Sequence, residues 1–217
     1  MFCTVNGVRL YYEVHGQGSP LLLVHGNGES HAIFDKAVPL LAKTHTVYTV
    51  DSRCHGQSTR TDTLHYADMA QDLIQFIRTM ELEKPILYGF SDGGILGLLI
   101  ALAEPELLGK MILSGANLNP DGLKAGMLLV CRLVAFTGNP LYRLMVTEPN
   151  IAPEQLAQIT VPTVVLAGEK DVIRRAHTET IAAHIPHSQL EILPGETHGS
   201  YIVHSEKLAA VLQPYLS

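Results

Sequence analysis

Short apolar runs alternate with amphipathic stretches along most of this 217-residue chain. Residues 8–14 alternate apolar and polar positions directly after Asn6-Gly7, a dipeptide typical of β-hairpin turns. Short, mostly apolar runs, typical of parallel strands covered on both faces, follow at 21–24, 46–50, 86–88, 111–113, 163–166 and 190–193. The chain therefore predicts a mostly parallel sheet with a hairpin near its start.

Helical patterns lie between these strands. Apolar residues at 66, 69, 70, 73, 74 and 77 recur with the 3.6-residue period of a helix buried on one face. Residues 175–184 and 205–212 also read as helices, and the apolar stretch 95–103 reads as a buried one. Strands that alternate with helices predict a doubly wound α/β fold, whose ligands bind at the carboxyl ends of the strands.

One segment, residues 118–160, breaks this alternation. Its 43 residues contain no clear strand, but they contain an apolar helical run at 123–136 followed by Pro140, Pro149 and Pro153. A segment of this length is too long for an ordinary connection. We expect a single α/β domain over residues 1–217, with 118–160 forming a short helical cap inserted between two strands.

Composition narrows the classes of function. The chain is 47% hydrophobic and 17% charged with a net charge of −6, which fits a soluble globule and offers no basic patch for nucleic acid. No apolar run reaches the roughly 18 to 20 residues of a membrane helix, and the N-terminus lacks the pattern of a signal peptide. The three cysteines form no CxxC pair. We expect a cytoplasmic protein without metal, cofactor, nucleic-acid or membrane partner.

Residues 89–93 read Gly-Phe-Ser-Asp-Gly and match the pattern G-x-S-x-G. In this pattern a sharp strand-to-helix turn exposes the serine, and glycines on either side remove Cβ atoms that would clash. The required context is present, because an apolar strand precedes Gly89 and an apolar helix follows. Ser91 is therefore the predicted nucleophile.

A serine hydroxyl needs a base and a carboxylate that orients this base. His198 follows the last predicted strand, and Asp171 follows the strand before it, so both should lie at the edge of the sheet that carries Ser91. The order Ser91, Asp171, His198 is the one expected for this architecture. Other histidines lie on or beside helices, and the spacing of His184 and His187 lacks the carboxylates of a metal site.

An acyl-transfer site also needs donors for an oxyanion. The backbone N–H of Asp92 opens the helix after Ser91, and the N–H of Asn27 lies in the flexible loop after strand 21–24. We assign the oxyanion hole to these two groups. For an apolar substrate pocket, the cap offers five candidates: Met127, Leu128, Val130, Phe136 and Met145.

These motifs together resemble the α/β-hydrolase superfamily over nearly the whole chain. HGNG (25–28) is similar to the oxyanion loop, DSRCHGQS (51–58) to the segment after the next strand, GFSDGG (89–94) to the nucleophile elbow, and GEKD (168–171) and ETHG (196–199) to the acid and histidine loops. Cys54 stands where the second motif usually has glycine, so the backbone there could differ or the thiol could pack against the site.

The resemblance also narrows the chemistry. Epoxide hydrolases and dehalogenases of this fold use an aspartate nucleophile, and the dehalogenases and haloperoxidase-like relatives use tryptophan, which this chain lacks. Hydrolysis of a small ester or thioester is the activity implied. The elbow is similar to that of valacyclovir-type amino-acid-ester hydrolases, in which a carboxylate beside the nucleophile can hold a substrate ammonium. Alternatively, Asp92 only stabilises the helix N-terminus.

Three alternatives stay open at this point. An acyltransferase or a C–C hydrolase could use the same triad, and a non-catalytic ligand receptor could be built on the same scaffold. The short cap further implies a rather open pocket, or one that a partner subunit completes, so a homodimer is one expectation.

Overall fold

The computed structural model describes residues 1–216 and contains one eight-stranded sheet in the order β1-β2-β4-β3-β5-β6-β7-β8. The strands are β1 (Phe2–Val5), β2 (Val8–His15), β3 (Ser19–Val24), β4 (His45–Val50), β5 (Ile86–Phe90), β6 (Lys110–Ser114), β7 (Thr163–Lys170) and β8 (Ser188–Thr197). Strands β4 to β8 and β3 pair in parallel, and only the β1–β2 and β2–β4 pairs are antiparallel. The predicted α/β fold is confirmed.

The antiparallel edge begins with the hairpin that Asn6-Gly7 predicts. Val5 pairs with Val8, and the two turn residues have φ values of 46° and 75°. Positive φ at both central positions is the conformation that favours Asn-Gly in a two-residue hairpin. The partner strand, β1, places Cys3 and Val5 in the core while Phe2 stays half exposed.

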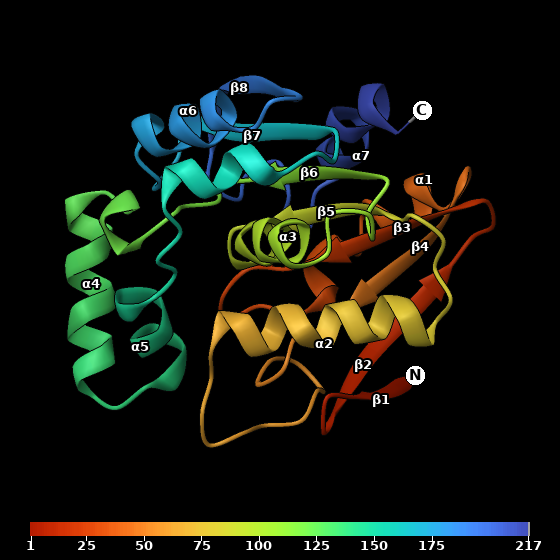
Figure 1. The fold of residues 1–217 in the computed structure, drawn as a ribbon, viewed down its shortest axis with the longest axis horizontal. Helices are drawn as coiled ribbons and strands as arrows, with labels where there is room; N and C mark the ends of the chain where they lie inside the picture. The colour runs from red at the N-terminus through yellow and green to blue at the C-terminus, as the bar shows by residue number, and fades with distance from the viewer. Residues whose placement is uncertain (217) are drawn as a thin grey trace.

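Helices cover both faces of the sheet (Figure 1). They are α1 (Val38–Leu41), α2 (Tyr66–Thr79), α3 (Asp92–Ala103), α4 (Ala125–Phe136), α5 (Pro140–Thr147), α6 (Arg175–His184) and α7 (Lys207–Leu212). Helices α2, α3 and α6 bury one apolar cluster, and α1 and α7 bury the other. The central strands are therefore mostly buried, and the sheet edge that ends β3, β5, β7 and β8 lies between two packed layers.

The segment 118–160 leaves the sheet between β6 and β7 and carries α4 and α5, which pack against each other at one end of the molecule (Figure 1). Pro140, the first of the three prolines after the predicted helical run, begins α5. Proline is tolerated at the first position of a helix, and the Asn139 side chain caps this helix by accepting from the N–H of Leu141 at 3.0 Å.

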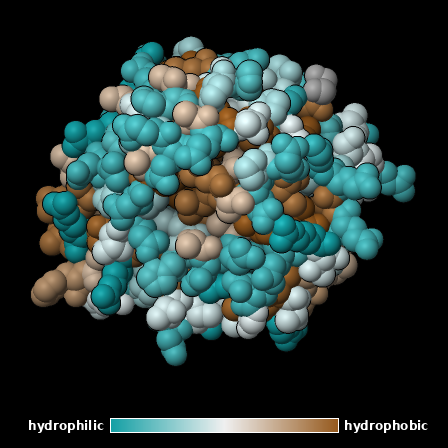
Figure 2. All heavy atoms as spheres, in the orientation of Figure 1, coloured by the Kyte–Doolittle hydropathy of each residue, from teal (hydrophilic) through white to brown (hydrophobic). Residues whose placement is uncertain are grey.

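One face of α4 is apolar and exposed. Leu129, Val130, Leu133 and Phe136 are 58%, 50%, 64% and 93% exposed, and Figure 2 shows apolar side chains at the edge of the molecule where α4 lies. Among residues 1–216, no helix has both the length and the apolar character needed to cross a membrane.

Candidate active site

The turn between β5 and α3 presents Ser91. Its φ of 52° and ψ of −112° lie outside the regions that L-residues favour, so the elbow holds the serine in strained backbone. The Ser91 N–H donates to the Ser114 carbonyl at 2.7 Å, and α3 begins at the next residue. The tight turn depends on glycine, because a Cβ on Gly93 would lie 2.3 Å from the Val24 carbonyl oxygen.

His198 and Asp171 lie beside Ser91. The Ser91 Oγ is 3.1 Å from His198 Nε2, and His198 Nδ1 is 2.7 Å from Asp171 Oδ1. The carboxylate can only accept, so Nδ1 carries the proton and Nε2 is free to accept from the serine. Asp171 is buried, and its Oδ1 also accepts from the Ile173 N–H at 2.8 Å. This chain of hydrogen bonds can carry a proton from Ser91 to the imidazole.

Strands β7 and β8 are longer than the sequence predicts, and their extra length places both side chains. The pairing continues past a register shift to Lys170 and Thr197, each of which directly precedes one of the two residues. Pro194 and Gly195 were expected to end the strand, but Gly195 adopts a φ of 75° and its N–H donates to the Glu169 carboxylate. The irregularity bends the strand without ending it.

Residues 26–29 form a tight turn after β3. The Glu29 N–H donates to the Gly26 carbonyl at 3.4 Å, and Gly28 has a φ of 74°, which a type II turn requires at this position. His25 anchors the turn, because its Nδ1–H donates to the Gly26 carbonyl at 2.7 Å while its Nε2 accepts from the Ser52 N–H at 3.0 Å. Burial lowers the pKa of His25 to about 4, so the ring is neutral at neutral pH.

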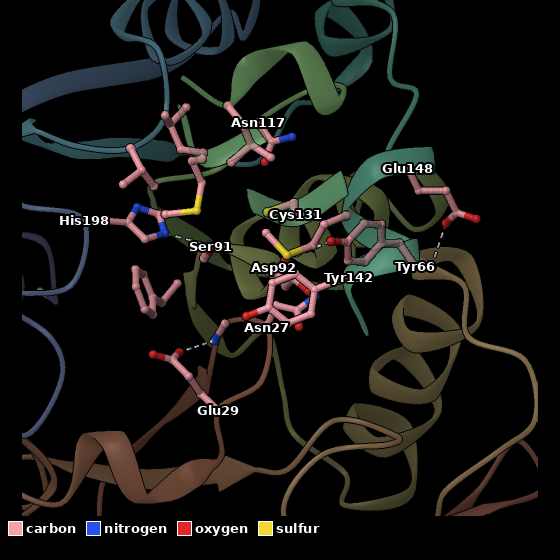
Figure 3. Close-up of a pocket in the computed structure, with 17 residues that line it drawn as sticks. Asn27, Glu29, Tyr66, Ser91, Asp92, Asn117, Cys131, Tyr142, Glu148 and His198 are labelled. Atoms are coloured by element: carbon pink, nitrogen blue, oxygen red, sulfur yellow. Dashed lines mark hydrogen bonds between the residues drawn. The ribbon is translucent and has the colours of Figure 1, made fainter. Parts of the chain in front are cut away.

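A cavity of about 150 Å³ opens above Ser91 (Figure 3). Of the pocket residues predicted from the sequence, Met127, Met145 and Asp92 line it. The assignments of Leu128, Val130 and Phe136 were wrong. Leu128 packs in a small cluster inside the cap, while the other two lie on the exposed face of α4. The helical period turns only one side of α4 toward the cavity, and that side carries Met127 and Cys131.

Several other residues that line the cavity were not predicted from the sequence. Tyr66 from α2, Tyr142 from α5 and Glu148 after α5 come from distant parts of the chain, and Glu29 and Asn117 come from loops. Their approach depends on how the cap folds over the sheet edge. Of these residues, only Tyr66 belonged to a sequence pattern, and the helical periodicity around it predicted a core position.

Comparison with known proteins agrees with this geometry. The family model described as "alpha/beta hydrolase fold" matches residues 19–130. The chain belongs to the alpha/beta hydrolase fold family. Human serine hydrolase BPHL is 26% identical over 98% of this chain and 84% of its own length. A 2-hydroxy-6-oxo-6-(2'-aminophenyl)hexa-2,4-dienoic acid hydrolase of Metapseudomonas resinovorans is 24% identical over 100% of this chain and 90% of its own length.

Solved structures show the same fold. The structure of a hydrolase from Pseudomonas aeruginosa PA01 matches with a TM-score of 0.82 at 25% identity, covering 100% of this chain and 98% of that one. Est816, described as an N-acyl homoserine lactone degrading enzyme, matches with a TM-score of 0.85 at 20% identity over the full length of both chains. The named relatives of this α/β hydrolase thus include a serine hydrolase and a dienoic acid hydrolase.

The departure of this α/β hydrolase from the family motifs at Cys54 has a structural answer. Cys54 adopts a φ of 66°, the left-handed conformation that the usual glycine would take. Its thiol is buried, accepts from the Thr61 N–H at 3.3 Å and does not line the cavity. The substitution therefore leaves the backbone path intact and adds nothing to the site.

Asp92 is the unusual side chain of this α/β hydrolase. It is 3% exposed, and its Oδ1 accepts from the Tyr66 hydroxyl at 2.8 Å. Its Oδ2 has no hydrogen-bond partner among the described residues, although the side chain lines the cavity. Burial raises the pKa of Asp92 to about 7, against hydrogen bonding from the Tyr66 hydroxyl and the Asn27 side chain, which lowers it. Asp92 is thus a buried carboxylate in the wall of the cavity, held by the hydrogen bond from Tyr66.

Proposed function

We propose that this α/β hydrolase cleaves small carboxylic esters or thioesters through an acyl-enzyme intermediate. The observation that carries the proposal is the hydrogen-bond chain from Ser91 through His198 to Asp171 at the mouth of the cavity. A serine in this position attacks a carbonyl as the imidazole takes its proton, and the carboxylate holds the imidazole in the required tautomer.

The oxyanion hole in this proposal consists of the N–H groups of Asn27 and Asp92. Asp92 begins α3, so its N–H is one of the free donors at the helix start. The Asn27 N–H has no acceptor among the described residues. Two such donors stabilise the tetrahedral intermediate, after which His198 protonates the leaving group. Water activated by the same imidazole then releases the acid.

The cavity supports a small substrate. At about 150 Å³ it is smaller than the roughly 300–1,000 Å³ of pockets that hold drug-sized ligands. We assign residues 118–160 the role of a cap, because Met127 and Cys131 of α4 and Met145 of α5 close the cavity from above. Short acyl groups fit this space better than long lipid chains.

The charge of the cavity favours a substrate with an amino group. Glu29, Asp92 and Glu148 line it, and none of its described lining residues is a lysine or arginine. A helix N-terminus stabilises an acid by only about 0.3–1 kcal/mol. Leaving a buried polar group unsatisfied costs about 1–3 kcal/mol, and more for a charged group. A substrate ammonium on the Asp92 carboxylate would add an ion pair that the helix N-terminus does not supply.

The same charges argue against the C–C hydrolase alternative for acidic substrates. The M. resinovorans relative is named for a dienoic acid, which is an anion at neutral pH. Such a substrate would meet three carboxylates and no Lys or Arg among the described residues that line this cavity. Like charges in a site of low dielectric repel strongly, so a neutral or cationic ester is favoured.

The test combines activity with active-site labelling. Wild-type protein should hydrolyse p-nitrophenyl acetate and react once per chain with a fluorophosphonate, and Ser91→Ala should lose both. Ser19→Ala is the matched control, because Ser19 is exposed at the opposite end of the parallel strands. Turnover retained by Ser91→Ala, or labelling of another residue, would refute the assignment.

A further inference from the structure

Glu29 closes the turn that carries Asn27 with two hydrogen bonds to Gly26. Besides the backbone hydrogen bond from the Glu29 N–H to the Gly26 carbonyl, the Glu29 carboxylate folds back so that its Oε2 accepts from the Gly26 N–H at 3.0 Å. In Figure 3 this carboxylate reaches the loop that carries Asn27. The backbone and the side chain of Glu29 therefore both close the turn onto Gly26.

The turn also lies against the nucleophile. A Cβ on Gly26 would lie 3.0 Å from the Ser91 Cβ, 3.4 Å from the Phe90 ring and 2.9 Å from Glu29 Oε2. Gly26 is thus in close contact with the elbow, and the next N–H along the chain is that of Asn27. A small rotation of the Gly26 peptide would change the direction of this N–H relative to the serine.

Glu29 is partly buried and lines the cavity, which is an expensive position for a carboxylate without an ion-pair partner. The structure shows no salt bridge to it among the described residues, and its one hydrogen-bond donor is the Gly26 N–H. What the partly buried Glu29 carboxylate stabilises is the conformation of the 26–29 turn. A group that stabilises one backbone conformation in an active site contributes preorganisation.

We propose that Glu29 is a positioning residue that fixes the 26–29 turn so that the Asn27 N–H points at the oxyanion formed on Ser91. This inference rests on the proposed function of Ser91. Glu29 acts as a hydrogen-bond acceptor, and its charge is not required. A glutamine places a carbonyl oxygen at the same reach and can accept the same Gly26 N–H.

The experiment measures kcat and KM for p-nitrophenyl acetate in Glu29→Ala and Glu29→Gln. Removing an oxyanion donor costs about 10²–10³-fold in kcat, so a donor that is misdirected but present should cost about tenfold. We expect Glu29→Ala to lower kcat about tenfold at nearly unchanged KM, and Glu29→Gln to stay within about twofold of wild type. Inhibition by phenylboronic acid, which forms a tetrahedral adduct on serine, should weaken in parallel with kcat.

Controls separate this proposal from the function on which it rests. Glu83→Ala removes an exposed glutamate in the loop between α2 and β5 and should leave kcat unchanged. If Glu29→Ala fails to fold, Glu29→Asp replaces it, since its carboxylate is one methylene short of the Gly26 N–H and should show the same loss. Wild-type kcat in these variants, or a Glu29→Gln enzyme as slow as Glu29→Ala, overturns the positioning role. Wild-type protein that neither turns over nor labels at Ser91 overturns the proposed function instead.

Discussion

The Tyr66 hydroxyl donates a 2.8 Å hydrogen bond to Oδ1 of Asp92, which joins the first residue of α2 to the first residue of α3. Both side chains are buried, and both line the cavity beside Ser91. This bond fixes the orientation of the Asp92 carboxylate in the cavity wall.

Asp92→Asn should discriminate between two classes of ester. A hydrogen bond to a charged group contributes about 1.5–3 kcal/mol, so we expect kcat/KM for an alanine or valine ester to fall about tenfold to a hundredfold. A neutral ester of equal size should lose less than about threefold, because it makes no ion pair. Steady-state kinetics on the matched pair measures this difference. Equal losses on both esters would show that Asp92 has no role in amine recognition.

The same substitution should change stability with pH. The folded pKa of Asp92, about 7, lies above its unfolded value near 3.9, so the folded state keeps a proton that the unfolded state releases. Wild-type stability therefore falls as pH rises from about 4 to about 7, by at most about 4 kcal/mol for this group. Asp92→Asn should raise the thermal midpoint relative to wild type at pH 8 and lose that advantage toward pH 4. A constant difference across this range would contradict the raised pKa.

Gly93→Ala should damage the elbow. The added Cβ would lie 2.3 Å from the Val24 carbonyl oxygen, and neither backbone can move without disturbing β3 or α3. Overpacking of this kind costs about 1–3 kcal/mol, and we expect loss of esterase activity with it. Gly126→Ala is the control, because an exposed Cβ in α4 meets nothing within 4 Å. That variant should be neutral or more stable by up to about 1 kcal/mol in urea unfolding.

Two cap residues that the sequence treats alike should behave differently. Met145 lines the cavity, whereas Phe136 is 93% exposed at the end of α4. Met145→Ala should enlarge the acyl space and raise the kcat/KM ratio of butanoate to acetate ester about three- to tenfold. Phe136→Ala should leave this ratio unchanged. A shift in the Phe136 variant would mean that α4 presents a different face to the substrate.

The cap is tied to α2 by a pH-dependent contact. Glu148 accepts from the Tyr66 N–H at 3.0 Å and from His65 Nδ1 at 2.6 Å, and this hydrogen bond raises the pKa of His65. A raised histidine pKa stabilises the contact below the unfolded value near 6.5, and the contribution disappears as pH rises through the folded pKa. Hydrogen-exchange protection of α5, corrected for intrinsic rates, should be greater in the wild type than in Glu148→Gln at pH 6. The two proteins should show equal protection of α5 by pH 9. A gap that persists at pH 9 would exclude the histidine as its source.

Local patterns predicted the scaffold and marked the catalytic candidates. Apolar runs of four or five residues that alternate with helical patterns favour the strands of a covered parallel sheet, and Gly-Phe-Ser-Asp-Gly between such a strand and a helix predicts a sharp elbow. The carboxyl ends of parallel strands meet at one edge, which is why Asp171 and His198 could be assigned from their places after two strands. These predictions follow from the hydrophobic periodicity of the strands and helices and from the parallel direction of the strands, and both can be read from the sequence.

The shape of the pocket and the polar side chains that line it depend on tertiary structure. Nothing in the sequence shows which side of α4 faces the sheet, because Leu128, Val130 and Phe136 are as apolar as Met127 and the helix can be rotated by its packing partners. The approach of Tyr66 to Asp92 and of Glu29 to Gly26 depends on side-chain directions set by the packing of neighbouring elements. The sequence by itself determined the fold and the serine at its edge, and only the folded chain decided which carboxylates surround that serine and what each can hold.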